Sequence, residues 1–170
     1  MMLKLFGALL IVIGCGGFGF LTAVYWKQEE LALRQLVGDL EFMVCELQYR
    51  MTPLPELCGQ TAGERNGLTS EFWKLMEAEL EQQMEPDVSC CVQSVLNRCG
   101  KLPEHTQKAL KILGQTLGRF DLEGQIQGLN FVKSHCCGEL ESMVQERDFR
   151  QKSYQTLGIC TGIALAIILV

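Results

Sequence analysis

Cysteine and histidine side chains are the residues of this chain best suited to chemistry, and they gather in two short stretches. The members are Cys90, Cys91, Cys99 and His105 in the first stretch, and His135, Cys136 and Cys137 in the second. Thiolate and imidazole groups are preferred ligands of zinc, so the two stretches together could be interpreted as a zinc site.

The spacing of these residues argues against that interpretation. Adjacent residues of a helix point about 100° apart, so neither pair of neighbouring cysteines can easily place both thiolates on one ion. The C-x-x-C pairs typical of structural zinc sites are missing. A cysteine nucleophile is also disfavoured, because nothing in the pattern marks one thiol as exposed or electropositive. We therefore expect no metal, no cofactor and no catalytic residue.

The cysteines as a set do not predict a disulfide framework either. The chain contains nine cysteines, an odd number, and their spacing does not repeat. Free cysteine is usually a small buried hydrophobe in proteins of a reducing compartment. We interpret the cysteines as reduced thiols that fill a core.

The charged residues lie almost entirely in the middle of the chain. The 170 residues include 20 Asp and Glu and 15 Lys and Arg, and of these only Lys4 lies outside residues 27–152. The middle segment therefore has a net charge of −6 (14 − 20). Its charges are interspersed and its aromatic residues few, which disfavours any nucleic-acid partner.

The two ends of the chain are uncharged over long stretches. Residues 5–26 contain no charged side chain and end in Tyr25 and Trp26, and residues 153–170 are likewise uncharged. A helix of about 20 apolar residues crosses the hydrocarbon core, and aromatic rings favour the headgroup level. We predict a transmembrane helix at 1–26, a helical domain at 27–152 and a C-terminal transmembrane helix at 153–170.

Processing and orientation of the N-terminal segment follow from its flanks. Residues 12–15 resemble a lipoprotein processing site, so cleavage before Cys15 stays an alternative. The apolar run continues to Trp26, however, and is longer than the apolar core of a cleavable signal peptide. Five basic residues flank the apolar ends on the side of the middle segment: Lys27, Arg34, Arg147, Arg150 and Lys152. The positive-inside rule then predicts that residues 27–152 are cytoplasmic.

Apolar residues of the middle segment recur at steps of three and four, which predicts helices. The predicted stripes are Leu36, Leu40, Met43, Val44 and Leu47; Leu54, Leu57, Cys58, Thr61 and Ala62; Phe72, Leu75, Met76, Leu80 and Met84; Val88, Cys91, Val92, Val95, Leu96 and Cys99; Ala109, Leu110, Ile112, Leu113, Thr116 and Leu117; and Leu122, Ile126, Leu129, Val132, Cys136, Leu140 and Met143. No stretch alternates strictly, so we expect no strand.

These stripes predict the all-α fold class, as a compact bundle of about six helices flanked by the N- and C-terminal transmembrane helices. The first and last helices are the long ones, and we expect them to pair antiparallel. No proline separates either of them from its apolar end segment, so each is expected to be continuous with it.

The acidic residues are interpreted as solvated. Glu30, Asp39, Glu41 and Glu46 lie opposite the first apolar stripe, on the helix face that a bundle leaves in water. Asp121 is expected to cap the last helix.

Proline marks the corner between the first two helices. Thr52 suits the N-cap position and Pro53 the first helical position, so the corner is interpreted first as structural. Arg50 and Glu56 are expected to be exposed at the membrane-distal end. Together with Thr52, Pro53 and Pro55 they form the candidate contact for a cytosolic partner.

Four segments of the chain together resemble one protein family. They are residues 2–8 (Met-Leu-Lys-Leu-Phe-Gly-Ala), 49–56 (Tyr-Arg-Met-Thr-Pro-Leu-Pro-Glu), 117–121 (Leu-Gly-Arg-Phe-Asp) followed by Gln125, and 153–158 (Ser-Tyr-Gln-Thr-Leu-Gly). In this order and spacing the chain resembles stage III sporulation protein AB of endospore-forming bacteria over nearly its whole length. The second segment is the most specific part.

The resemblance implies a membrane component of the channel assembled between mother cell and forespore during engulfment. The implied location is the mother-cell membrane around the forespore, with the bulk of the chain cytoplasmic. The helical domain is similar to one repeat of the platform protein of type II secretion and type IV pilus machines, which sits over a cytoplasmic ATPase. The implied partners are other stage III channel subunits, a secretion-type ATPase and the lipid bilayer, and a homo-oligomer stays open.

Two other functional classes are weighed against this one. The cysteine stretches are not part of the family pattern, so a redox- or metal-sensing membrane protein that uses them stays an alternative. A chemoreceptor-like signalling hairpin would need long heptad runs, which Pro53, Pro86 and Pro103 interrupt.

Overall fold

A computed structural model shows an all-helical protein. It describes the backbone of residues 2–64, 67–82, 87–100, 102–117 and 121–169, and side chains for the same residues except 2–24 and 147–169. The helices are α1 (Met2–Arg50), α2 (Leu54–Glu64), α3 (Ser70–Gln82), α4 (Val88–Arg98), α5 (Glu104–Thr116) and α6 (Leu122–Leu169). No strand occurs among the described residues, and the predicted six-helix, all-α bundle is confirmed.

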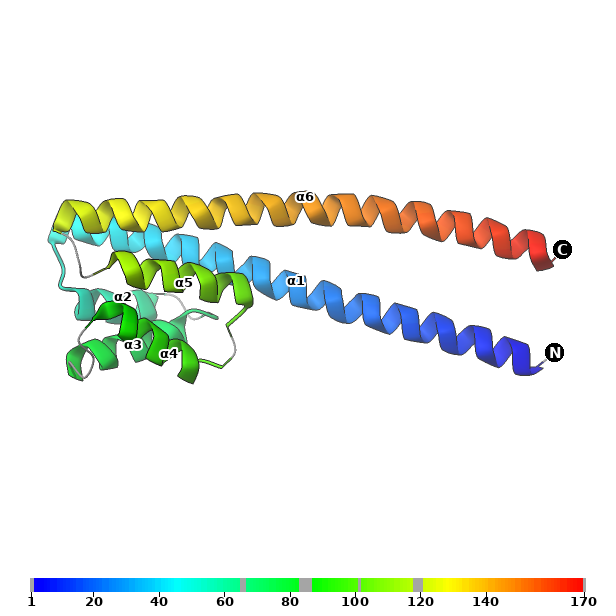
Figure 1. The fold of residues 1–170 in the computed structure, drawn as a ribbon, viewed down its shortest axis with the longest axis horizontal. Helices are drawn as coiled ribbons and strands as arrows, with labels where there is room; N and C mark the ends of the chain where they lie inside the picture. The colour runs from blue at the N-terminus through cyan, green and yellow to red at the C-terminus, as the bar shows by residue number, and fades with distance from the viewer. Residues whose placement is uncertain (1, 65–66, 83–86, 101, 118–120, 170) are drawn as a thin grey trace.

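The two long helices, α1 and α6, frame the molecule. They pack against each other along the bundle and continue past it, so that both chain termini lie at the same end (Figure 1). Helices α2 to α5 cluster beside the other end of the pair (Figure 1). The expected antiparallel pairing of the long helices is confirmed, and so is the continuity of each with its apolar end segment.

The membrane segments are not tested by the described side chains. Within that part of the chain, none of the helices has the length and apolar character needed to cross a bilayer. The predicted transmembrane helices at 1–26 and 153–170 lie outside the residues with described side chains, except for Tyr25 and Trp26. Both therefore stay predictions.

The core is built from the predicted apolar stripes, and every described helix contributes to it. Its fully buried members include Leu36, Leu40, Met43, Leu57, Phe72, Val95, Leu110, Leu129 and Val132. Full burial of such a side chain stabilises the fold by about 1.5–3 kcal/mol. Helices as short as α2 and α4 are marginal in isolation, so this shared core is what keeps them folded.

The predicted apolar stripes differ from the observed core at a few positions. The prediction that Leu122 faces the core is wrong, because it is the first residue of α6 and 36% of its surface is exposed at the end of the bundle. Trp73 was not predicted in the core, yet it is buried and packs edge-on against Phe72, with ring centroids 5.0 Å apart. Met84 lies outside the described residues.

The seven cysteines with described side chains are free thiols. The core-filling interpretation is confirmed for Cys58, Cys91, Cys99 and Cys136, which are buried, and is wrong for Cys45 and Cys90, which are exposed. Burial, followed by the charge of Glu77, raises the pKa of Cys58 to about 12. Burial likewise raises the pKa of Cys136 to about 12.

These differences predict thiol reactivity. Because the thiolate is the nucleophile, Cys58 and Cys136 should be alkylated far more slowly than Cys45 and Cys90 in the folded protein. A short iodoacetamide pulse at pH 8, followed by peptide mass spectrometry, measures the four rates. Equal labelling of all four thiols in the folded chain would contradict the burial described here.

The same pKa shifts predict how folding stability depends on pH. From the ordinary thiol pKa of 9.0 up to about 12, the unfolded chain ionises Cys58 and Cys136 while the folded chain does not. Their contribution to stability is therefore intact below pH 9 and is lost as the pH rises toward 12. Chemical denaturation at pH 8 and pH 10.5, compared between the wild type and the Cys58→Ala and Cys136→Ala variants, measures this loss.

Candidate partner-binding corner between α1 and α2

The predicted contact residues share the turn that joins α1 to α2. Helix α1 ends at Arg50 and α2 begins at Leu54, so the chain itself brings the five residues together. The turn lies at the end of the bundle opposite both termini (Figure 1). We call Arg50, Thr52, Pro53, Pro55 and Glu56 the α1–α2 corner.

The corner is exposed except at its centre. Arg50, Pro53 and Glu56 are exposed, as expected for a contact surface, and Pro55 is half-buried. Thr52 is buried, with 7% of its surface accessible. The corner therefore presents one basic and one acidic side chain to solvent around a buried threonine.

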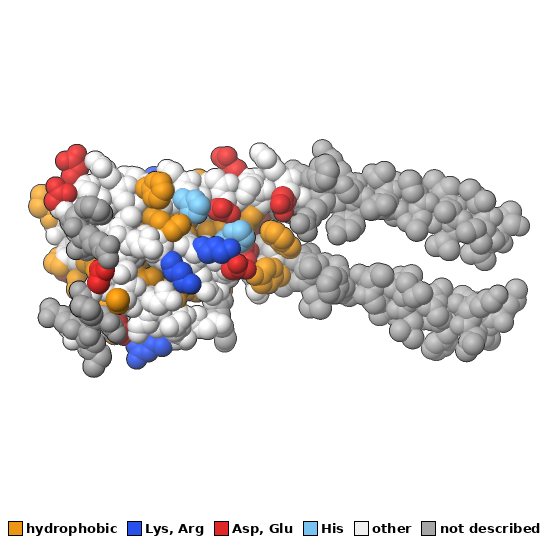
Figure 2. All heavy atoms as spheres, in the orientation of Figure 1, with side chains coloured by type: hydrophobic (Ala, Val, Ile, Leu, Met, Phe, Trp, Pro, Cys, Tyr) orange, Lys and Arg blue, Asp and Glu red, His pale blue; other side chains and the backbone are white. Residues whose placement is uncertain are grey.

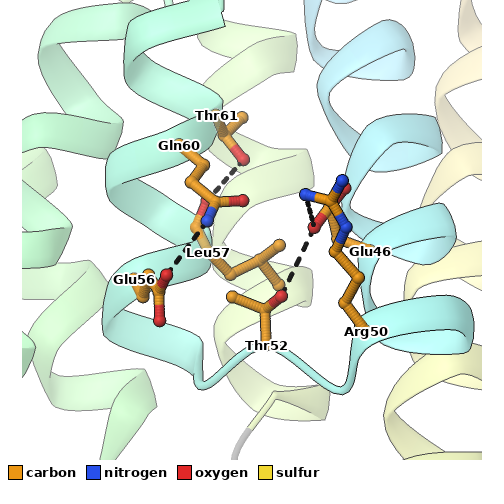
Figure 3. A network of polar contacts seen from close by, with 7 residues as sticks. All are labelled: Glu46, Arg50, Thr52, Glu56, Leu57, Gln60 and Thr61. Carbon is orange, nitrogen blue, oxygen red and sulfur yellow. Dashed lines mark hydrogen bonds and ion pairs between the residues drawn. The ribbon is translucent and has the colours of Figure 1, made fainter.

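Glu46, on the last turns of α1, holds the corner in place. One of its carboxylate oxygens accepts a hydrogen bond from the Thr52 hydroxyl at 3.3 Å and pairs with the Arg50 guanidinium at 3.5 Å (Figure 3). The Glu46 side chain is only 13% exposed. Beyond the turn, Gln60 donates to the Glu56 carboxylate at 3.1 Å (Figure 3).

The N-cap role predicted for Thr52 is wrong. Helix α2 begins at Leu54, which places Pro53 at the N-cap position, and the Pro53 carbonyl accepts the first helical hydrogen bond from Leu57 at 2.9 Å. The Thr52 hydroxyl donates back to Glu46 instead. A proline suits a helix start because it has no N–H to satisfy there.

Met51, which the sequence did not single out, is the unusual residue of this turn. Its φ of 53° is the one left-handed backbone angle at a non-glycine residue in the described chain. Glycine usually takes this conformation just after a helix, and another residue there costs about 1–2 kcal/mol. Met51 is 70% exposed and the neighbouring Tyr49 is 85% exposed. A methionine carries no turn signal, so local sequence patterns could not have revealed it.

A buried carboxylate ties α1 to the start of α3. Asp39, only 2% exposed, accepts hydrogen bonds at one oxygen from the Thr69 hydroxyl at 2.6 Å and from the Trp73 indole N–H at 2.8 Å. The prediction that Asp39 faces water is wrong, because these two buried donors take the place of solvent. The nearby Gln35 side chain also accepts from the backbone N–H of Leu68 at 2.9 Å.

Two more buried carboxylates link different helices of the bundle. Glu29 of α1, 1% exposed, accepts from the backbone N–H of His105 at the start of α5, at 2.7 Å. Nδ1 of the His105 ring in turn lies 2.9 Å from a carboxylate oxygen of Glu139 in α6. Glu79 of α3 pairs with Arg98 of α4 at 2.7 Å. The prediction that the acidic residues are solvated is therefore also wrong for these two carboxylates.

The described cysteine and histidine side chains of the two stretches do not form a common site. Cys90 is exposed whereas the adjacent Cys91 is buried, and His105 pairs with a carboxylate rather than with a thiol. Among the side chains that the structure describes, no group of three or more His, Cys, Asp or Glu is placed to hold a metal ion.

Comparison with known proteins identifies similar chains. The family model described as stage III sporulation protein AB matches residues 4–170. Stage III sporulation protein AB of Bacillus subtilis (strain 168) is 25% identical over 170 residues, which cover 99% of each chain. A solved structure of a stage III sporulation protein AB matches with a TM-score of 0.63 at 20% identity, covering 72% of this chain and 98% of that one. At this identity the structural match shows the fold alone.

The hydrogen bond between Thr52 and Glu46 predicts a coupling between the two residues. Thr52→Val keeps the shape but removes the hydroxyl, and should lower the free energy of unfolding by about 1 kcal/mol. In the Glu46→Ala background the same substitution should cost little, which a double-mutant cycle by chemical denaturation measures. An equal cost in both backgrounds would show that the hydroxyl acts elsewhere.

The Asp39 contacts predict a larger effect inside the bundle. Asp39→Ala strands the buried donors of Thr69 and Trp73, at a cost of about 1–3 kcal/mol each in the free energy of unfolding. Asp39→Asn keeps an acceptor oxygen and should lose less. The two variants are compared by thermal denaturation, and an alanine variant as stable as the wild type would refute this role for Asp39.

Proposed function

Since the chain belongs to the stage III sporulation protein AB family, we propose that it is a non-catalytic membrane platform of the channel between mother cell and forespore. In this role it resides in the mother-cell membrane around the forespore and assembles with other stage III channel subunits. A secretion-type ATPase docks on its cytosolic face. Holding a cytoplasmic ATPase at the membrane is also the role of the platform proteins of type II secretion and type IV pilus machines.

Membrane attachment is proposed at both ends of the chain. Residues 1–26 and 153–170 form two transmembrane helices, and residues 27–152 form the cytosolic domain. The support is the uncharged character of both end segments together with the continuity of α1 and α6 through them. Both helices continue past the bundle toward a common end (Figure 1), as two membrane anchors of one domain would.

The position of the α1–α2 corner is the observation that carries the docking proposal. The corner lies at the end of the bundle away from both termini (Figure 1), where a cytosolic partner meets it first. Its Arg50 and Glu56 side chains are exposed there. Glu46 and the buried Thr52 hold the turn in one conformation, which reduces the ordering cost of binding.

Charge reversal at the corner tests this proposal. Binding of the purified sporulation ATPase to the full chain in nanodiscs is measured by titration. Arg50→Glu should weaken binding about tenfold or more, because it replaces the ion pair with Glu46 by like-charge repulsion and so loosens the turn that presents the corner. Without measurable binding by the wild type, the platform role fails.

Arg34→Glu is the matched control. Arg34 pairs with Glu30 four residues away on α1, as Arg50 pairs with Glu46, and both arginines are exposed. The two substitutions therefore break equivalent helix-surface pairs at different places. Equal losses of affinity for both variants would remove the corner from the binding site.

A further inference from the structure

Neither the backbone conformation nor the solvent exposure of position 51 favours a methionine. Its φ of 53° suits glycine, which takes this angle without the steric penalty of a Cβ. Burial does not compensate, because 70% of the residue is exposed. Residues with strained backbone cluster at active sites, ligand-binding sites and switch regions, so the angle at Met51 points to a function for this turn.

Two other exposed hydrophobic residues lie at the same end of the bundle as Met51. Tyr49 is 85% exposed, and Leu122, the first residue of α6, is 36% exposed. Helix α6 begins beside the end of α1 (Figure 1), so the three residues share the end of the bundle opposite the termini. We call Tyr49, Met51 and Leu122 the tip patch.

The described surroundings of the tip patch are acidic. Glu56, Asp121 and Glu123 are exposed carboxylates in the turns that carry the patch. The positive charge of Arg50 is offset by its ion pair with Glu46. Figure 2 shows hydrophobic and acidic side chains next to one another at this end of the molecule.

The exposed apolar side chains and their acidic surroundings together favour one class of binding partner. A second copy of the chain would bring the acidic rims together, which like-charge repulsion disfavours. An anionic lipid surface would be repelled in the same way. A protein surface with an apolar pocket and a rim of Lys or Arg matches both the patch and its charge.

We propose that Met51 and Tyr49 are the anchor by which the tip patch inserts into a basic-rimmed apolar pocket of a soluble protein. Methionine adapts its shape to an irregular pocket, and tyrosine is enriched among residues that dominate binding energy. The chemistry of the partner follows from the tip patch alone. Its identity as the cytoplasmic ATPase rests on the proposed function.

Met51→Gly separates binding from folding. The substitution relieves the backbone, so the full chain should be at least as stable as the wild type in chemical denaturation. Its affinity for the purified sporulation ATPase should nevertheless fall about tenfold or more, as should that of Tyr49→Ala, because both remove the anchor. Unchanged affinity of both variants would overturn the inference.

Phe131→Ala is the matched control for an exposed apolar side chain. Phe131 is 62% exposed on α6, nine positions after Leu122, and lies outside the tip patch. Its removal should leave the affinity for the ATPase unchanged. If Phe131→Ala weakens binding as much as Met51→Gly does, the anchor is not specific to the tip.

Spore formation distinguishes failure of the inference from failure of the proposed function. Each variant replaces the chromosomal copy in the native organism, and heat-resistant spores are counted at matched protein levels. If the wild type does not bind the ATPase but Met51→Gly still lowers the spore count tenfold, the proposed docking fails while the anchor stands with another partner. Full sporulation of Met51→Gly and Tyr49→Ala overturns the anchor.

Discussion

The antiparallel packing of α1 against α6 is the contact on which the rest of the structure depends. Because the two helices run in opposite directions, the chain starts and stops at one end of the molecule and turns at the other (Figure 1). The buried faces of both helices line the core that the short helices complete. Lys133 of α6 and Glu41 of α1 add an ion pair of 3.8 Å across the pair, which as a surface contact contributes less than the core.

Buried carboxylates fix how the short helices sit on this pair. Asp39 holds the start of α3 through Thr69 and Trp73, and Glu29 holds the start of α5 through the His105 N–H. Apolar packing alone tolerates small rotations, whereas a buried charge without its donors is costly. These contacts therefore hold the starts of α3 and α5 at fixed positions along α1.

The helices could be predicted from the sequence, but several contacts of the site could not. Helical spacing and proline punctuation reveal α1 to α6 because the side-chain period and the missing proline N–H are local properties. The partner of Thr52 depends on where Glu46 lies after the turn, which is a tertiary fact. A charge pattern assigns Asp39 to the surface, since only the folded chain brings its donors to it. The left-handed backbone of Met51 leaves no trace in residue type.

The central claim is that the tip of the bundle contacts a cytoplasmic ATPase in the sporulating cell. Its most direct test is photo-crosslinking, with a photoreactive amino acid placed at position 49 or at position 131 of the full chain. The crosslinked product is identified by mass spectrometry during engulfment. The account predicts a crosslink to the sporulation ATPase from position 49 and none from position 131. A crosslink to the ATPase from position 131 only, or from neither position, would contradict it.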